Sequence, residues 1–242
     1  MMRHVILSMS IVAFVGCQQA EETVEPAAPA ETPAATDPMD AAVVAPDHYK
    51  VEFENDQVRV LRITYAAGDE TAMHSHPDGV AVFLSDQNAE FTLEDGTTAE
   101  RPAKAGDVLW TPAETHAPKA LTDVSLVLVE IRDGGEMAMA DADTDATVVA
   151  PDHYKVDFEN DQVRVLRITY AAGDETAMHS HPDGVVVFLA DAEGEMTLPD
   201  GSTRESPGKA GDVLWAGQET HGVKALTDIS VVLVELKGSE GE

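Results

Sequence analysis

Cysteine is almost absent from this chain of 242 residues, in which Cys17 is the only one. Since Cys17 has no second cysteine to pair with, no disulfide within the chain can stabilise the fold. The rest of the chain also offers no thiol as a nucleophile or a metal ligand. Any metal bound beyond Cys17 must therefore be held by nitrogen and oxygen atoms.

Basic residues are also scarce, because 15 Lys and Arg stand against 45 Asp and Glu and give a formal net charge of -30. A surface this acidic repels the phosphates of nucleic acids and the headgroups of anionic lipids, so neither is an expected partner. The charge is typical of a solvated surface, with an acidic face that attracts cations or a basic partner as the alternative. The expected partner is a small-molecule ligand.

The apolar run near the N-terminus extends only from Val5 to Val15, which is too short to span a bilayer comfortably. With a basic residue before it and Gly16-Cys17 after it, the run has the layout of a secretory signal. Its end resembles the lipobox of bacterial lipoproteins, in which the cysteine becomes a diacylated N-terminus. The resemblance implies a lipoprotein signal peptide over residues 1–17 with lipidation at Cys17; the alternative is a simple signal peptide with a coincidental cysteine.

The residues after Cys17 bear on localisation. Lipoproteins without Asp directly after the cysteine generally go to the outer membrane, and Gln18 stands here. The resemblance thus implies export to the cell envelope, on the periplasmic side of the outer membrane, with the lipid anchor as the only membrane contact. Residues 18–43 are rich in Pro, Ala, Glu and Thr, so we predict a disordered acidic linker.

An internal repeat organises the rest of the chain. Residues 44–132 and 149–237 align without a gap and differ at 21 of 89 positions. We therefore predict two similar domains with these boundaries, a flexible acidic linker over 133–148 and a tail over 238–242. The linker is long enough for the second domain to lie beside the first, and we expect the two domains to pack on each other.

Each repeat has the pattern of an all-β protein. Segments rich in Val, Ile, Leu and Thr are separated by turn signals, and neither repeat contains a sustained 3.6-residue period. Strands are predicted within 51–53, 57–65, 80–84 and 125–131, whereas residues 87–89, 101 and 103 are predicted to lie in turns. Strands at such intervals are typical of a barrel or a jelly roll.

Histidine recurs at matched positions in the two repeats. His74 and His76 are two residues apart, so their side chains share a face if the segment is a strand, and His116 follows later. The second repeat has the same pattern, at His179, His181 and His221. Three imidazoles can hold Zn, Fe(II), Ni, Cu or Mn and leave coordination positions open. We therefore predict one divalent transition metal in each repeat, with Fe, Mn, Ni and Zn as open choices.

These positions resemble the two sequence motifs of the cupins. The first motif runs G-x5-H-x-H-x3,4-E-x6-G, and this chain matches it at Gly68 and at the histidine pair. The second motif runs G-x5-P-x-G-x2-H-x3-N, and the matching residues are Gly106, Pro112 and His116. The resemblance implies a bicupin, in which each repeat is a jelly-roll barrel, or double-stranded β-helix, with a metal inside.

The departures from the motifs concern acidic residues. Val80 and Ala81 stand where cupins carry a glutamate ligand. The resemblance thus implies a three-histidine site, as in the thiol and diketone dioxygenases of the family, and the spacing also fits a zinc site of the carbonic-anhydrase type. Glu114 and its counterpart Glu219 are the acidic residues nearest in sequence to a ligand histidine, which makes them the catalytic candidates.

Three classes of function fit these features. The first is a metal-dependent enzyme of the cell envelope, dioxygenase-like or lyase- or isomerase-like, and the second is a non-catalytic periplasmic module that binds or senses a small molecule or a metal. The third is a structural scaffold. The repeats also differ near the distal histidine, where Gly217 replaces Pro112 and leaves the approach to His221 freer. The second site is expected to bind metal several-fold more weakly, or to accept a different substrate.

Overall fold

The computed structural model describes residues 37–132 and 142–238 of the chain. The predicted signal peptide with Cys17, and most of the linkers predicted over 18–43 and 133–148, lie outside the described residues, as does most of the predicted tail. Among the residues described, no helix is long and apolar enough to cross a membrane.

The two repeats have the same succession of elements, and strands dominate both. The first repeat contains α1 (Ala41–Val44), β1 (Tyr49–Glu54), β2 (Val58–Tyr65), β3 (His74–His76), β4 (Gly79–Phe83), β5 (Gln87–Leu93), β6 (Thr98–Ala103), β7 (Val108–Thr111), β8 (Glu114–Ala120) and β9 (Val124–Ile131). The second contains α2 (Ala146–Val149), β10 (Tyr154–Glu159), β11 (Val163–Tyr170), β12 (His179–His181), β13 (Gly184–Phe188), β14 (Gly194–Thr197), β15 (Thr203–Glu205), β16 (Val213–Ala216), β17 (Glu219–Ala225) and β18 (Ile229–Leu236).

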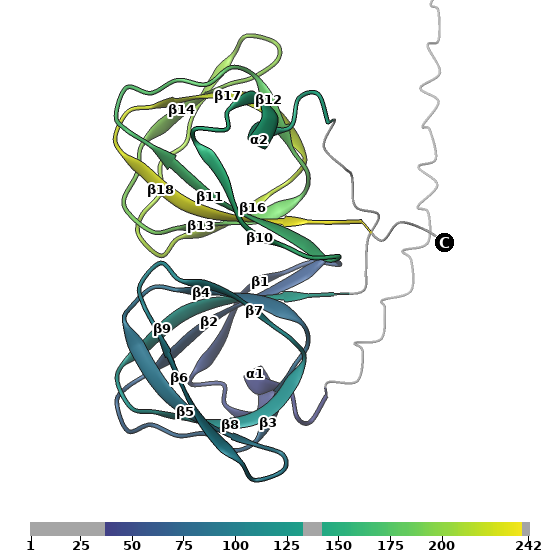
Figure 1. Ribbon diagram of the computed structural model, residues 1–242, viewed down its shortest axis with the longest axis vertical. Helices are drawn as coiled ribbons and strands as arrows, with labels where there is room; N and C mark the ends of the chain where they lie inside the picture. The colour runs from purple at the N-terminus through teal and green to yellow at the C-terminus, as the bar shows by residue number, and fades with distance from the viewer. Residues whose placement is uncertain (1–36, 133–141, 239–242) are drawn as a thin grey trace, which may run out of the picture. The chain divides into compact units, whose positions relative to one another are not determined.

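Each repeat folds into two antiparallel sheets. The first repeat has the strand orders β1-β2-β9-β4-β7 and β3-β8-β5-β6, and the second has β10-β11-β18-β13-β16 and β12-β17-β14-β15. Neighbouring strands are often distant in the sequence, as in a jelly roll. Within each repeat the two curved sheets close into a barrel (Figure 1). The predicted fold class, two tandem all-β barrels, is confirmed.

Three of the predicted strands, β2, β4 and β9, bury both of their faces, whereas β1, which contains the strand predicted within 51–53, is largely exposed. In β2, Val58 and Val60 belong to a buried cluster that also contains valines of the second repeat. Leu61 and Ile63 belong to a separate cluster within the first barrel. A strand buried on both faces has a nearly continuous apolar sequence, which explains why β2, β4 and β9 were visible in the sequence.

The prediction of turns at residues 87–89, 101 and 103 is wrong, because these residues lie in β5 and β6. Almost all of β6 is exposed, and β5 is buried only in part. Exposed strands need no apolar pattern, so polar residues hid both of them from a search for hydrophobic runs.

The described structure begins at residue 37, ahead of the boundary predicted at 44. Asp40 caps α1 by accepting a hydrogen bond from the backbone N–H of Ala42, and its other oxygen accepts one from Arg59 Nη1 at 2.5 Å. The carbonyl oxygen of Met39 accepts a hydrogen bond from the backbone N–H of Ser75 in β3 at 2.7 Å. These residues therefore contact the strand that carries two of the histidines.

Candidate metal centre

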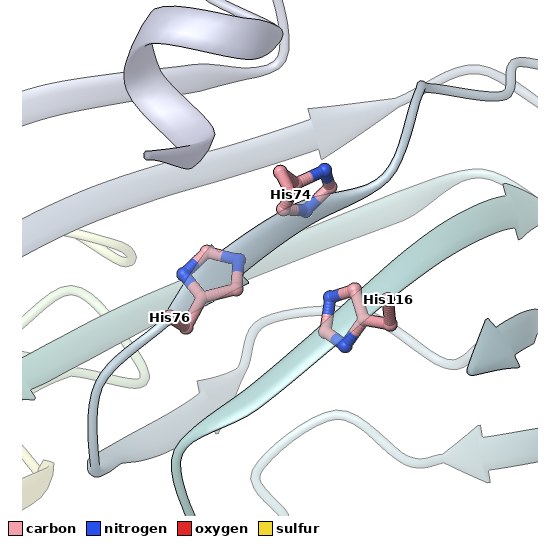
Figure 2. A group of neighbouring side chains, drawn as sticks. All are labelled: His74, His76 and His116. Atoms are coloured by element: carbon pink, nitrogen blue, oxygen red, sulfur yellow. The ribbon is translucent and has the colours of Figure 1, made fainter. Parts of the chain in front are cut away.

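Two short strands bring three histidines together in the first repeat. β3 supplies His74 and His76, and its antiparallel partner β8 supplies His116, which the register places opposite His74. Because alternate residues of a strand share a face, the two β3 imidazoles lie on the side that carries His116 (Figure 2). One ligand nitrogen from each ring lies within 4.8 Å of the others. The predicted ligands thus form one group.

The second repeat builds the same group from its own strands. His179 and His181 in β12 meet His221 in β17, again with ligand atoms within 4.8 Å of one another. His74 and His179 are both 0% exposed. Each triad is therefore held inside its barrel rather than on its surface.

Every histidine of the first triad has an oxygen acceptor at Nδ1. These acceptors are the carbonyl oxygen of Ala72 for His74 at 2.9 Å, Oε1 of Glu130 for His76 at 2.8 Å, and Oε1 of Glu114 for His116 at 2.7 Å. An acceptor at Nδ1 favours the tautomer with its proton there, so Nε2 keeps a free lone pair. Histidines that bind metals are usually oriented in this way by their other ring nitrogen.

Whether a metal fits depends on whether the Nε2 atoms of the triads are free to bind it. Within residues 37–132 and 142–238, Nε2 of His74 is buried and has no hydrogen-bond partner. An unpaired buried nitrogen costs about 1–3 kcal/mol, and a metal ion would relieve this cost. In the second repeat, the hydroxyl of Tyr154 lies 2.8 Å from Nε2 of His179 and donates to it. With a proton at each Nδ1, the Nε2 lone pairs of the first triad fit a divalent transition metal, and in the second triad a metal would take the place of the Tyr154 hydroxyl at His179.

Burial keeps two histidines of each triad neutral at physiological pH. Burial lowers the pKa of His74 to about 4, and the nearby rings of His76 and His116 act in the same direction. The pKa of His179 is lowered to about 4 for the same reasons. Burial also lowers the pKa of His116 and, in the second triad, of His221. Since only neutral imidazole binds a metal, these ligands need not lose a proton first.

A buried glutamate that the sequence reasoning missed orients His76. Glu130 is 1% exposed and lies opposite Arg59 across the β2–β9 pairing, and Arg59 Nε donates to Glu130 Oε2 at 2.5 Å. Arg59 also forms an ion pair with Asp40. A chain of contacts therefore runs from His76 through Glu130 and Arg59 to Asp40. The second repeat repeats the chain with His181, Glu235, Arg164 and Asp145. The sequence did contain a sign of this role, because Glu130 interrupts the apolar run of β9. Glutamate is seldom buried unless it is paired, so such a position indicates a buried partner.

Glu114 and Glu219, the catalytic candidates, contact the Nδ1 side of their histidines and not the metal-facing side. Arg101 donates two hydrogen bonds to Glu114, at 2.8 and 2.7 Å, and lowers the pKa of Glu114 to about 2. Partial burial of Glu219 acts in the opposite direction, but its pKa is also lowered, through the hydrogen bond from Arg204 at 2.8 Å. A carboxylate with a pKa near 2, such as that of Glu114, is a poor proton acceptor near pH 7. Because both glutamates contact the Nδ1 side of a ring, their geometry favours a role in orienting the histidines.

Two tyrosines form one wall of each triad. The ring of Tyr49 packs edge-on against His74 with centroids 4.8 Å apart, and Tyr65 donates its hydroxyl hydrogen to Tyr49 at 2.9 Å. Burial raises the pKa of both hydroxyls, so both stay protonated at neutral pH. Tyr154 and Tyr170 repeat this pair at 2.8 Å.

An apolar cavity opens beside each triad. The first has a volume of about 250 Å³ and is bordered by His76, His116 and Trp110. The second has a volume of about 660 Å³ and is bordered by the corresponding histidines and Trp215. Small-molecule sites are typically apolar hollows with a few polar groups, so each barrel has space for a ligand next to its triad.

Comparison with known proteins adds solved structures only, because no family model and no curated protein matches the sequence. A cupin 2 conserved barrel domain protein from Leptotrichia buccalis matches with a TM-score of 0.50 and 14% identity, covering 78% of this chain and 88% of its own. A variant of oxalate decarboxylase from Bacillus subtilis matches with a TM-score of 0.53 and 14% identity, over 76% and 70%. A variant of salicylate 1,2-dioxygenase from Pseudoaminobacter salicylatoxidans matches with a TM-score of 0.50 and 12% identity, over 74% and 68%. The chain therefore has the fold of the cupin-domain proteins, twice over.

Proposed function

We propose that the protein is a bicupin in which each repeat holds one divalent transition metal, Fe, Mn, Ni or Zn, through three histidine Nε2 atoms. In this proposal each repeat takes up a small, mostly apolar molecule in the cavity beside its metal. The observation that carries the proposal is the set of acceptors at all three Nδ1 atoms, together with the unpaired Nε2 of His74. Residues that served only to fill a core would have no need of three oriented imidazoles.

The proposed activity is that of a metal-dependent enzyme on a small molecule, dioxygenase-like or lyase- or isomerase-like. A bound ion would supply a Lewis-acid centre with open coordination positions. The residues of the chain have other tasks: Glu130 and Glu114 fix the orientation of two rings, and Tyr49 packs against a third. The apolar cavity wall keeps water away, which strengthens electrostatic interactions inside it.

Metal analysis tests the proposal directly. Mature protein purified under anaerobic conditions and loaded with Fe, Mn, Ni and Zn in turn is expected to contain close to two ions per chain, one for each triad. The double variant His74→Ala/His76→Ala should lose half of the metal. His48→Ala is the matched control, because His48 stacks on Tyr65 outside the triad and should change nothing. Wild-type protein that holds no metal after every loading would contradict the proposal.

A specific observation favours a second candidate, a non-catalytic module that binds or senses a small molecule. The pKa of Glu114 lies far below neutrality and that of Tyr49 far above it, so neither group exchanges protons readily near pH 7. Incubating the loaded protein with small aromatic alcohols in air, and analysing the recovered compound by mass spectrometry, separates the candidates. Conversion supports the enzyme, and binding without conversion supports the module.

We also propose that the protein is an exported lipoprotein on the periplasmic side of the outer membrane. The support is the sequence pattern that ends at Cys17. Cys17→Ser is expected to release the protein from the membrane fraction or to leave it unprocessed, with the signal peptide attached. Gln19→Ala, two residues away, should be processed and fractionated normally. Normal processing and membrane association of the Cys17→Ser protein would rule the anchor out.

A further inference from the structure

The differences between the two repeats gather around the cavities. Of the 89 aligned positions, 26 border one cavity or both, and 13 of these carry different residues, whereas the other 63 positions carry only 8 differences. In contrast, the histidines are identical in the two repeats, as are the glutamates and the tyrosine that contact them and the arginine that pairs with the buried glutamate. The residues of the two triads are thus alike, and the spaces beside them are not.

One exchange sets the position of an aromatic ring in the cavity wall. Phe188 in β13 is 5% exposed and lies against Gly208, where a Cβ atom would be only 2.2 Å from Cε1 of the ring. The first repeat has Ala103 at the matched position, so its ring, Phe83, cannot occupy the equivalent place. Phe83 is accordingly less buried and borders the smaller cavity. Gly208 thus lets the second ring lie deeper in the wall of its cavity, which it still borders.

A second set of exchanges changes the part of the wall beside Glu114 and Glu219. In the first repeat, Arg101 lies over the ring of Phe91, 4.7 Å from its centroid, and Glu114 holds the guanidinium in place. In the second repeat Ser206 and Met196 occupy these positions. A flexible methionine thus replaces a rigid ring, and the cation comes instead from Arg204, at the position of Ala99, which contacts Met196 and Glu219. The walls of the two cavities therefore differ at the positions of Phe91, Ala99 and Arg101.

We propose that the two cavities take ligands of different size, a compact apolar molecule with one ring in the first and a longer two-ring molecule in the second. The volumes are about 250 Å³ and about 660 Å³. An apolar cavity of about 150 Å³ holds benzene, so the first cavity admits one ring with little room to spare, and the second admits two. This inference rests on the proposed function, since it assigns the cavities to small-molecule binding beside the metals.

The two tryptophans allow each cavity to be followed separately. Trp110 borders the first cavity and Trp215 the second, and the sequence has no other tryptophan. In the full chain, the emission of a Trp215→Phe variant therefore reports on the first cavity and that of a Trp110→Phe variant on the second. Phenol is expected to bind to both. 4-Phenylphenol, which adds only a second ring, should bind the second cavity about tenfold more tightly, the order of discrimination that steric fit gives in apolar pockets.

Exchanging single residues between the repeats tests the cause. Gly208→Ala is expected to push Phe188 toward the cavity and to weaken 4-phenylphenol binding there by about tenfold, with phenol binding little changed. If Gly208→Ala does not fold, Met196→Phe/Ser206→Arg gives the same test, because it restores a rigid ring and adds a second arginine to the wall that already holds Arg204. The reverse change in the first repeat, Phe91→Met/Arg101→Ser, should admit 4-phenylphenol to the first cavity.

Equal affinity of the two cavities for 4-phenylphenol, or no binding of either compound to either cavity, overturns the inference. The proposed function fails in a different measurement, because absence of metal after loading is scored on the same preparations by elemental analysis. A preparation that holds two metals but binds neither compound would therefore refute the size selection and leave the metal centres standing.

Discussion

Glu130→Gln is expected to lower the free energy of unfolding by about 3 kcal/mol and to weaken metal binding in the first repeat by about 10–100-fold. Glu130 is 1% exposed and accepts hydrogen bonds from both Arg59 and His76. Glutamine keeps the shape but has only one acceptor oxygen, so its amide group must face one of the two donors. The loss of charge also leaves the guanidinium of Arg59 with Asp40 as its only acidic partner among the described residues.

Urea unfolding and competition with a metal chelator measure the two effects. The matched control is Glu54→Gln, because Glu54 and Arg132 form an exposed pair at 2.6 Å and such pairs contribute about 0–1 kcal/mol. Glu235→Gln should reproduce the loss in the second repeat and spare the first metal. If Glu130→Gln shifted the unfolding midpoint no more than Glu54→Gln does, the buried pair would not have the role assigned to it.

Metal-free protein is expected to become less stable as the pH falls from about 6.5 to about 4. In the unfolded chain a histidine takes up its proton near pH 6.5, whereas in the folded protein His74 and His179 do so only near pH 4. Between these values the unfolded state binds more protons, so acid favours unfolding. At pH 5 the loss is on the order of 2 kcal/mol for each of the two histidines.

Urea unfolding at pH 7 and pH 5, with a chelator present, measures this loss. Glu114 does not contribute in this window, because its pKa of about 2 places its own loss of stabilisation at lower pH. The variant His74→Gln/His179→Gln should show a much smaller difference between the two pH values, whereas His48→Gln should keep the full difference. An unchanged pH dependence in the double variant would show that other groups cause it.

The sequence was sufficient for the barrels and the triads because both depend on local patterns. β2 and β9 are buried on both faces, so their apolar runs are continuous. The pair His74 and His76 shares a face through the two-residue period of a strand. His116 lies on a different strand, β8, and reaches the pair through the register of β3 with β8. Its membership in the site was predicted from the resemblance to the second cupin motif and from its counterpart His221 in the second repeat.

The supports of the triad escaped prediction because they depend on pairings between distant residues. Arg59 and Glu130 are 71 positions apart and meet only through the β2–β9 register. Asp40 lies in a stretch whose composition is that of a linker, although Asp40-Ala41 has a counterpart in Asp145-Ala146 at the same offset as the repeat. β5 and β6 were missed for a different reason, since their exposed residues carry no apolar pattern.

The strand that carries His74 and His76 lies at the end of its sheet, since β3 is first in the order β3-β8-β5-β6. A free edge strand exposes N–H and C=O groups that invite pairing with another chain and hence aggregation. The hydrogen bond from Ser75 to Met39 covers this edge with the chain's own backbone. In the second repeat, the backbone N–H of Ser180 in β12 donates to the carbonyl oxygen of Thr144 at 2.7 Å and covers the corresponding edge. Residues just ahead of each repeat thus shield the strand with the histidine pair from intermolecular sheet formation.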